Sequence, residues 1–87
     1  MGNVLHNSIR TLLDGIELEP VRALLLSAAL RMTRLDKQMR QGCRLVILKG
    51  MAPVDAGRKV RRPRQNISRA LTTLRPVLEV VRKAYDE

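Results

Sequence analysis

The chain has 87 residues, of which 45% are hydrophobic and 29% charged, and this is the size of one small domain rather than several. A large enzyme fold with its own cofactor domain is therefore excluded. Tyr85 is the only aromatic residue, so the core must consist of Leu, Ile, Val, Met and Ala. Such a core favours packed helices over an aromatic-rich β-sandwich. We therefore predict a small all-α helical bundle that forms a single domain over residues 1–87.

Positive charge is concentrated in the middle of the sequence. The chain has 17 Lys and Arg residues against 8 Asp and Glu residues, which gives a net charge of +9. Residues 1–42 carry +2, residues 43–65 carry +6 and residues 66–87 carry +1. Arginine predominates, and its guanidinium group binds phosphates through two parallel hydrogen bonds. The composition therefore predicts a polyanionic partner.

Two amphipathic helices are predicted in the first half of the chain. Apolar residues at helical intervals indicate a short helix over residues 3–14, which Gly15 ends. Pro20 suits the first position of a longer helix over residues 20–41. Apolar residues spaced alternately by four and three form a seam along this helix, and we expect the seam to pack against a second copy of the chain. The predicted dimer seam consists of Val21, Leu25, Ala28, Met32, Leu35 and Met39.

A second seam with the same spacing predicts a C-terminal helix over residues 66–85, and it consists of Ile67, Leu71, Leu74, Leu78, Val81 and Tyr85. Asn66 is available as its N-cap. Pro76 lies inside the helix, where it removes a backbone donor and crowds the preceding turn. We therefore expect a kink or a break near residues 74–75.

The region between the two seams is less regular. Residues 45–48 are an apolar run whose periodicity does not distinguish helix from strand. A lone strand would leave its backbone groups unpaired, so we favour a short buried helix and keep a strand added to a neighbouring chain as the alternative. Residues 50–65 contain two glycines and two prolines and are predicted to form a basic, mobile loop.

Side chains suited to catalysis are few. The chain has one His, one Cys and eight carboxylates, and it lacks a Cys and His cluster with the spacing of metal ligands. It also lacks a glycine-rich phosphate loop and a dinucleotide-binding turn. We therefore predict a protein that is not an enzyme and that holds neither a metal nor a cofactor. Cys43 is predicted to be a buried hydrophobic residue, with a reactive thiol as the alternative.

Two groups of basic residues are candidates for nucleic-acid binding. Residues 57–65 include five positive charges within seven positions, which is typical of an arginine-rich RNA-binding or nuclear-localisation segment. The other group lies on the back of the long predicted helix and just after it. For both groups, phosphate contact and a merely solvated surface are open. The candidates are Arg31, Arg34, Lys37, Arg40 and Arg44 in the helix group, and Arg58, Lys59, Arg61, Arg62 and Arg64 in the segment.

The scarcity of aromatic residues limits the mode of binding. Unpaired bases would find no aromatic surface for stacking, which disfavours single-strand recognition. The long predicted helix begins with mostly apolar residues, which disfavours a helix-turn-helix reader of DNA. We therefore expect sequence-independent binding of duplex RNA in preference to DNA. The alternative is a helical adaptor or inhibitor that docks an amphipathic helix on a protein partner and uses its charge for targeting or for an acidic partner.

We expect an intracellular location because the sequence shows neither a signal peptide nor an apolar run that could span a bilayer. The expected compartment is the cytoplasm, with the nucleus as an alternative through the basic segment 58–64. No membrane partner is expected.

Part of the sequence resembles the nodavirus suppressors of RNA silencing. The resemblance rests on Leu30-Arg31-Met32 in a long helix, on residues 42–48 and on the run over residues 49–56. The resemblance extends from residue 30 to residue 56 and so covers about 27 of the 87 residues.

This resemblance implies a viral protein that is a small all-helical dimer, with a four-helix bundle that lays basic side chains along double-stranded RNA. It also implies that Arg31 contacts phosphate, with Arg34 and Lys37 as its neighbours. The chain departs from the family in two ways. Its first predicted helix is much shorter, and the C-terminal helix interrupted by Pro76 has no counterpart there.

Overall fold

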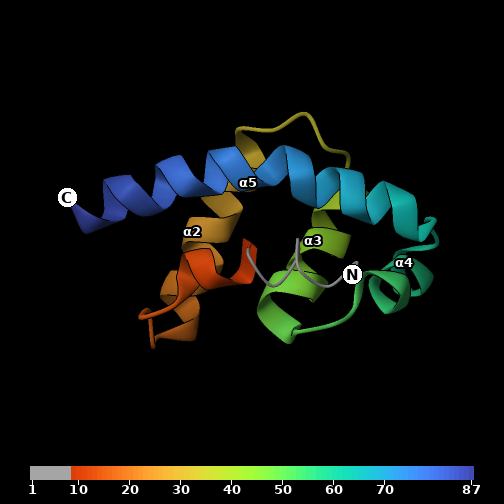
Figure 1. The fold of residues 1–87 in the computed structure, drawn as a ribbon, viewed down its shortest axis with the longest axis horizontal. Coiled ribbons are helices and arrows are strands. Elements are labelled where there is room, and N and C mark those ends of the chain that lie inside the picture. The colour runs from red at the N-terminus through yellow and green to blue at the C-terminus, as the bar shows by residue number, and fades with distance from the viewer. Residues whose placement is uncertain (1–8) are drawn as a thin grey trace.

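The computed structural model of the chain describes residues 9–87 (Figure 1). Within this range the chain forms a short 3-10 helix and four α-helices, and it forms no strand. The all-α bundle predicted from the sequence is thus confirmed. The elements are η1 (Thr11–Leu13), α2 (Glu19–Arg31), α3 (Lys37–Lys49), α4 (Pro53–Val60) and α5 (Arg64–Asp86).

Helix α5 sets the length of the molecule. Its 23 residues span ~35 Å at the usual helical rise, which agrees with the longest extent of the fold, 36 Å. α2, α3 and α4 all pack against α5. Figure 1 shows α2 beneath the C-terminal half of α5 and α4 at its N-terminal end. The first and last parts of α5 are therefore covered by different helices.

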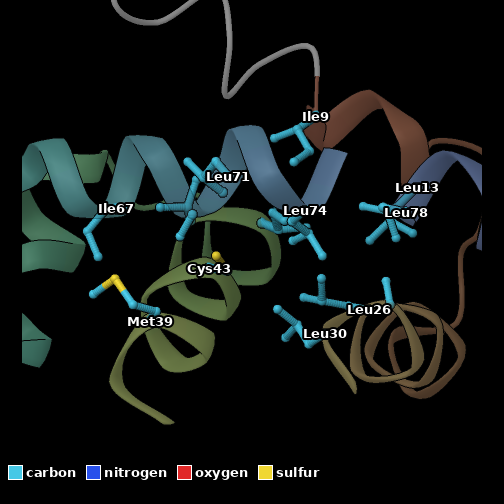
Figure 2. Packing of buried hydrophobic residues seen from close by; sticks show 14 of the residues in the cluster. Ile9, Leu13, Leu26, Leu30, Met39, Cys43, Ile67, Leu71, Leu74 and Leu78 are labelled. Atoms are coloured by element: carbon cyan, nitrogen blue, oxygen red, sulfur yellow. The ribbon is translucent and has the colours of Figure 1, made fainter. Parts of the chain in front are cut away.

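The core is built on one face of α5. Its central wall consists of Ile67, Leu71, Leu74 and Leu78, whose side chains are buried and spaced by four and three residues. Side chains of α2 approach this wall at its C-terminal end, and side chains of α3 approach it at its N-terminal end (Figure 2). The seam predicted for the C-terminal helix is thus a core face as far as Leu78, whereas Tyr85 is exposed.

The predicted helix over residues 20–41 is wrong, because the chain leaves the helix after Arg31. The hydroxyl of Thr33 donates to the backbone carbonyl three residues earlier, at 2.7 Å. The carboxylate of Asp36 then caps the next helix by accepting a hydrogen bond from the backbone N–H of Met39, at 2.8 Å. Thr and Asp compete for nearby backbone groups in this way and favour helix ends over helix interiors.

The break also removes the predicted dimer seam. Its six residues, Val21 to Met39, are divided between α2, the connecting turn and α3. Leu25 and Met39 are buried in the core of the chain itself, whereas Ala28 and Met32 are exposed. The six side chains therefore do not form one continuous surface for a second copy.

The predicted loop over residues 50–65 is wrong in its centre, where helix α4 forms. Pro53 occupies the first turn of α4, where a backbone N–H is not needed. Gly57 lies where α4 approaches the next turn, and a Cβ atom there would be 2.5 Å from the carbonyl oxygen of Arg62. Pro53 and Gly57 thus support this helix, although their residue types indicate a loop at the level of sequence.

Residues 45–48 belong to α3, which confirms the helical alternative for this apolar run. Helix α5 begins at Arg64 and continues through Pro76. The break, one of the two alternatives predicted near residues 74–75, is therefore wrong, whereas the kink stays a prediction. Figure 1 shows α5 as one continuous, gently arched helix.

The short helix predicted over residues 3–14 is only partly covered by the described residues. Residues 9 and 10 are helical and lead into η1, while residues 3–8 lie outside the described range. Between residues 9 and 87, no helix has both the length and the apolar character needed to cross a bilayer.

Candidate nucleic-acid interface

The whole positive excess lies in one part of the folded chain. Residues 31–69 include twelve basic and two acidic side chains, a net charge of +10, and we call this part the basic half. Residues 9–30 carry −1 and residues 70–87 carry no net charge, and together they form the neutral half. The basic half comprises α3, α4 and the start of α5, whereas the neutral half comprises most of α2 and the end of α5.

The five residues predicted as a ridge on one helix surround the turn between α2 and α3 and continue along α3. Arg31 ends α2, Arg34 lies in the turn and Lys37 opens α3, and all three are exposed. Arg40 and Arg44 follow on α3 and are half-buried. The Nε atom of Arg40 is buried without a hydrogen-bond partner in the described part of the chain, which is uncommon for a buried donor. Arg40 therefore retains unused hydrogen-bonding capacity.

A groove of about 300 Å³ brings members of the two predicted groups together. Lys37 lies on its α3 side, and Lys59 and Arg61 lie on the side formed by the end of α4. None of the side chains around the groove is acidic. Three cations around one depression suit a phosphate, because their repulsion is relieved when an anion enters. The groove is lined by Lys37, Gln38, Gln41, Lys59, Val60 and Arg61.

Arg62, which the sequence assigned to nucleic-acid contact, is engaged within the protein. Its Nε donates to Oε1 of Gln38 at 2.8 Å, and its Nη2 also hydrogen-bonds to Gln38. An ion pair joins the same Nη2 to Oδ2 of Asp36 at 3.3 Å. These contacts attach the turn between α4 and α5 to the start of α3. Arg62 thus positions the two sides of the groove.

The other candidates of the basic segment point to separate surfaces. Arg58 lies beside Asp55, with 3.9 Å between Nη1 and Oδ1, and both side chains are exposed. Arg64 lines a second groove, of about 430 Å³, between α4 and α5. Arg69 lies on the same groove, and sequence reasoning missed it because it belongs to an ordinary amphipathic helix pattern. The second groove thus adds two arginines to the basic half.

The thiol of Cys43 does not contribute to this surface. The side chain is fully buried in α3, and burial raises its pKa to about 12 against a small opposing effect of Arg44. The prediction of a buried Cys43 is therefore confirmed. Among residues 9–87, no group of three or more His, Cys, Asp or Glu side chains is placed to hold a metal ion.

Comparisons with protein-family models, with curated proteins and with solved structures found no match to this chain. The function is therefore argued from the charge and geometry of the site.

Proposed function

We propose that the protein binds duplex nucleic acid through its basic half, with duplex RNA preferred over DNA and without dependence on sequence. The observation that carries this proposal is the net charge of +10 over residues 31–69, gathered around grooves that open between helices. Most of these cations are not neutralised by the protein. Of the ten predicted contact residues, only Arg58 and Arg62 form an ion pair within the described chain.

The chemistry of the surface favours phosphates over bases. Arginine and lysine contacts to phosphates release counterions, which makes binding strong at low salt and independent of sequence. The deep, narrow major groove of duplex RNA keeps side chains away from base edges, so binders follow the phosphates and the 2′-hydroxyls. Tyr85, the single aromatic residue, lies near the C-terminus in the neutral half, far along α5 from the basic grooves. The basic half therefore lacks a stacking platform for unpaired bases.

We also propose that the protein self-associates through the outer face of α2, which retains Ala28 and Met32 of the predicted seam and adds Leu24. Leu24 and Met32 are 68% and 63% exposed, and with Ala28 they form a stripe with a spacing of four residues. This stripe lies largely in the neutral half. Two chains of charge +9 repel each other least when their neutral halves meet and their basic halves point apart. A dimer formed in this way leaves both basic halves free.

The experiment that tests nucleic-acid binding is competition between one ~20 base-pair sequence as duplex RNA, as duplex DNA and as single strand, at ~150 and ~400 mM salt. The decisive variant carries Lys37→Gln, Lys59→Gln and Arg61→Gln around the first groove. We expect its affinity for duplex RNA to be at least about tenfold lower than that of the wild type. The slope of the logarithm of the binding constant against the logarithm of the salt concentration should be reduced in magnitude by about 0.9 for each phosphate that the variant no longer neutralises. A separate double variant, Arg31→Ala with Arg34→Ala, tests the α2–α3 turn.

The matched control is Arg75→Gln, because Arg75 lies in the neutral half and is paired with Glu79. It should bind duplex RNA as the wild type does. Equal affinity of the triple variant and the wild type would exclude the first groove as the binding surface. Tighter binding to duplex DNA would overturn the preference for RNA. Weak binding that does not distinguish the three nucleic acids and that vanishes at the higher salt would favour the adaptor alternative, and the implied similarity to the nodavirus suppressors would lose its functional support.

A further inference from the structure

A hollow of about 550 Å³ lies between the start of α2 and the end of α3. It is larger than either groove of the basic half. α2 and α3 have 13 residues each, so the hollow lies ~20 Å along these helices from the turn that joins them. It is therefore separate from the cluster of Arg31, Arg34 and Lys37 and needs its own explanation.

Three cations surround this hollow. Arg10 comes from the segment before η1, Arg22 from α2 and Lys49 from the last turn of α3. Glu19 is the only carboxylate among the lining residues, so the lining carries a net charge of +2. Within the described part of the chain, no ion pair joins Glu19 to any of the three. Like charges held around one hollow favour an anion within it.

The geometry of Arg10 supports an anion site independently of the charge count. Its Nε atom is buried and has no hydrogen-bond partner among residues 9–87. Its guanidinium lies over Gly50, with Nη2 3.3 Å from the point where a Cβ would be. Gly50 has a φ of +71° and leaves this space open. A buried donor without an acceptor is destabilising, and an anion bound to this guanidinium would supply acceptors.

We propose that this hollow binds a phosphate monoester. Arg10, Arg22 and Lys49 hold the dianionic phosphate, because guanidinium groups bind two phosphate oxygens at once and an ammonium adds a point charge. The remaining wall is aliphatic, formed by Pro20, Ala23, Ile47 and Leu48. The body of the ligand lies against this wall. The same chemistry is offered by a free phosphorylated small molecule and by the 5′-terminal phosphate of a nucleic-acid strand.

The test uses the full chain, with inorganic phosphate, adenosine 5′-monophosphate and adenosine as probes in calorimetric titrations. We expect saturable binding of the monophosphate at least about tenfold tighter than that of adenosine, because the phosphate supplies the contacts. Arg22→Gln and Lys49→Gln should each weaken it about tenfold, whereas Lys83→Gln, an exposed change at the end of α5, should leave it unchanged. Backbone amide signals of Ala23 and Gly50 should shift during the titration. Equal affinity of the wild type and both variants, or no saturable binding, would overturn the proposal.

The source of the phosphate is tested with duplex RNA that carries either a 5′-phosphate or a 5′-hydroxyl. If Arg22→Gln weakens the binding of the 5′-phosphorylated duplex but not that of the 5′-hydroxyl duplex, the site receives the end of a strand. If it weakens monophosphate binding but neither duplex, the site receives a small molecule. The proposed phosphate site does not depend on the proposed duplex binding. The titration with adenosine 5′-monophosphate tests the site alone, and the 5′-hydroxyl duplex tests the basic half alone.

Discussion

Arg61 has a backbone conformation that glycine adopts more easily. Its φ of 61° and ψ of 43° are left-handed, and it is the only non-glycine residue with positive φ between residues 9 and 87. Its side chain lines the first groove. Because a left-handed conformation costs a non-glycine residue roughly 1 kcal/mol or more, the basic side chain is present here at the expense of stability.

Replacement of Arg61 by glycine should therefore separate stability from binding. We expect Arg61→Gly to raise the free energy of unfolding by about 1 kcal/mol in urea titrations, because the strain at the end of α4 is removed. The same variant should bind duplex RNA several-fold more weakly. If it is more stable but binds as the wild type does, the Arg61 side chain does not contact phosphate.

Cys43 gives a second test at the scale of one residue. The thiolate is the reactive form, and burial holds the pKa of this thiol at about 12. We expect iodoacetamide to modify the native protein at pH 8 about 100-fold or more slowly than the urea-unfolded chain, as followed by mass spectrometry. Cys43→Ala provides the background, since the chain has no other cysteine. Equal rates in the two states would contradict the burial of Cys43.

The direction of the pH dependence follows from the same raised pKa. The folded thiol stays protonated at a pH where the unfolded thiol, with its ordinary pKa of 9.0, has ionised. Cys43 therefore contributes its full stability below pH 9, and this contribution is lost as the pH rises from 9 toward 12. Cys43→Ala should lose less stability over this range than the wild type.

At the scale of elements, two glycines mark close approaches of different kinds. At Gly57, an added Cβ would lie 2.5 Å from the backbone oxygen of Arg62, whereas at Gly42 it would lie 2.6 Å from the tip of the Ile67 side chain. A side-chain tip moves more easily than a backbone carbonyl. We therefore expect Gly57→Ala to destabilise the fold by about 2 to 3 kcal/mol. Gly42→Ala should destabilise it by clearly less, because the Ile67 side chain can move aside and the higher helix propensity of Ala then offsets part of the overpacking. Urea unfolding of both variants checks the order, and the reverse order would show that α4 does not pack closely on the turn after it.

The elements that could be predicted from sequence are those in which the apolar residues keep one helical spacing and the face that they form is the face buried in the core. The wall from Ile67 to Leu78 is such a case, because its spacing coincides with a buried face. The break between α2 and α3 was missed because apolar residues happen to keep a helical spacing across it. Thr33 and Asp36 carry the signal that would have revealed it, since their side chains capture backbone groups locally.

The candidate site was predictable in its residues but not in its shape. Lys37 and Lys59 are 22 positions apart in sequence, and only the packing of α3 on α4 brings them to one groove. Counting charges in the sequence does not distinguish a basic side chain that lines a groove from one that is bonded within the protein and holds the sides of the groove in place. Arg61 and Arg62 illustrate this, because they are neighbours in sequence, yet the first lines the groove and the second is held by Asp36 and Gln38.

At the scale of the whole molecule, charge and exposed apolar surface are separated. The basic half carries the full positive excess. Four of the six exposed large apolar side chains among residues 9–87 belong to the neutral half, namely Leu18, Leu24, Val80 and Tyr85, whereas Met32 and Val54 belong to the basic half. A small domain that buries about 60% of its unfolded surface gains stability from further apolar contact. The separation allows one half to associate with protein while the other half meets a polyanion.

Self-association through α2 is tested by placing charge on its outer face. The wild type, at tens of micromolar, should sediment as a dimer of the 9.9 kDa chain, and Leu24→Glu should sediment as a monomer, because an exposed carboxylate on each copy would be buried in the interface. The matched control is Val54→Glu, because Val54 is also an exposed apolar residue but lies on α4 in the basic half. This change should leave the dimer intact. Folding is expected to survive both changes, since neither side chain belongs to the core. A monomeric wild type would exclude a second copy from this face. A dimer that survives Leu24→Glu but dissociates in Val54→Glu would place the interface on the basic half.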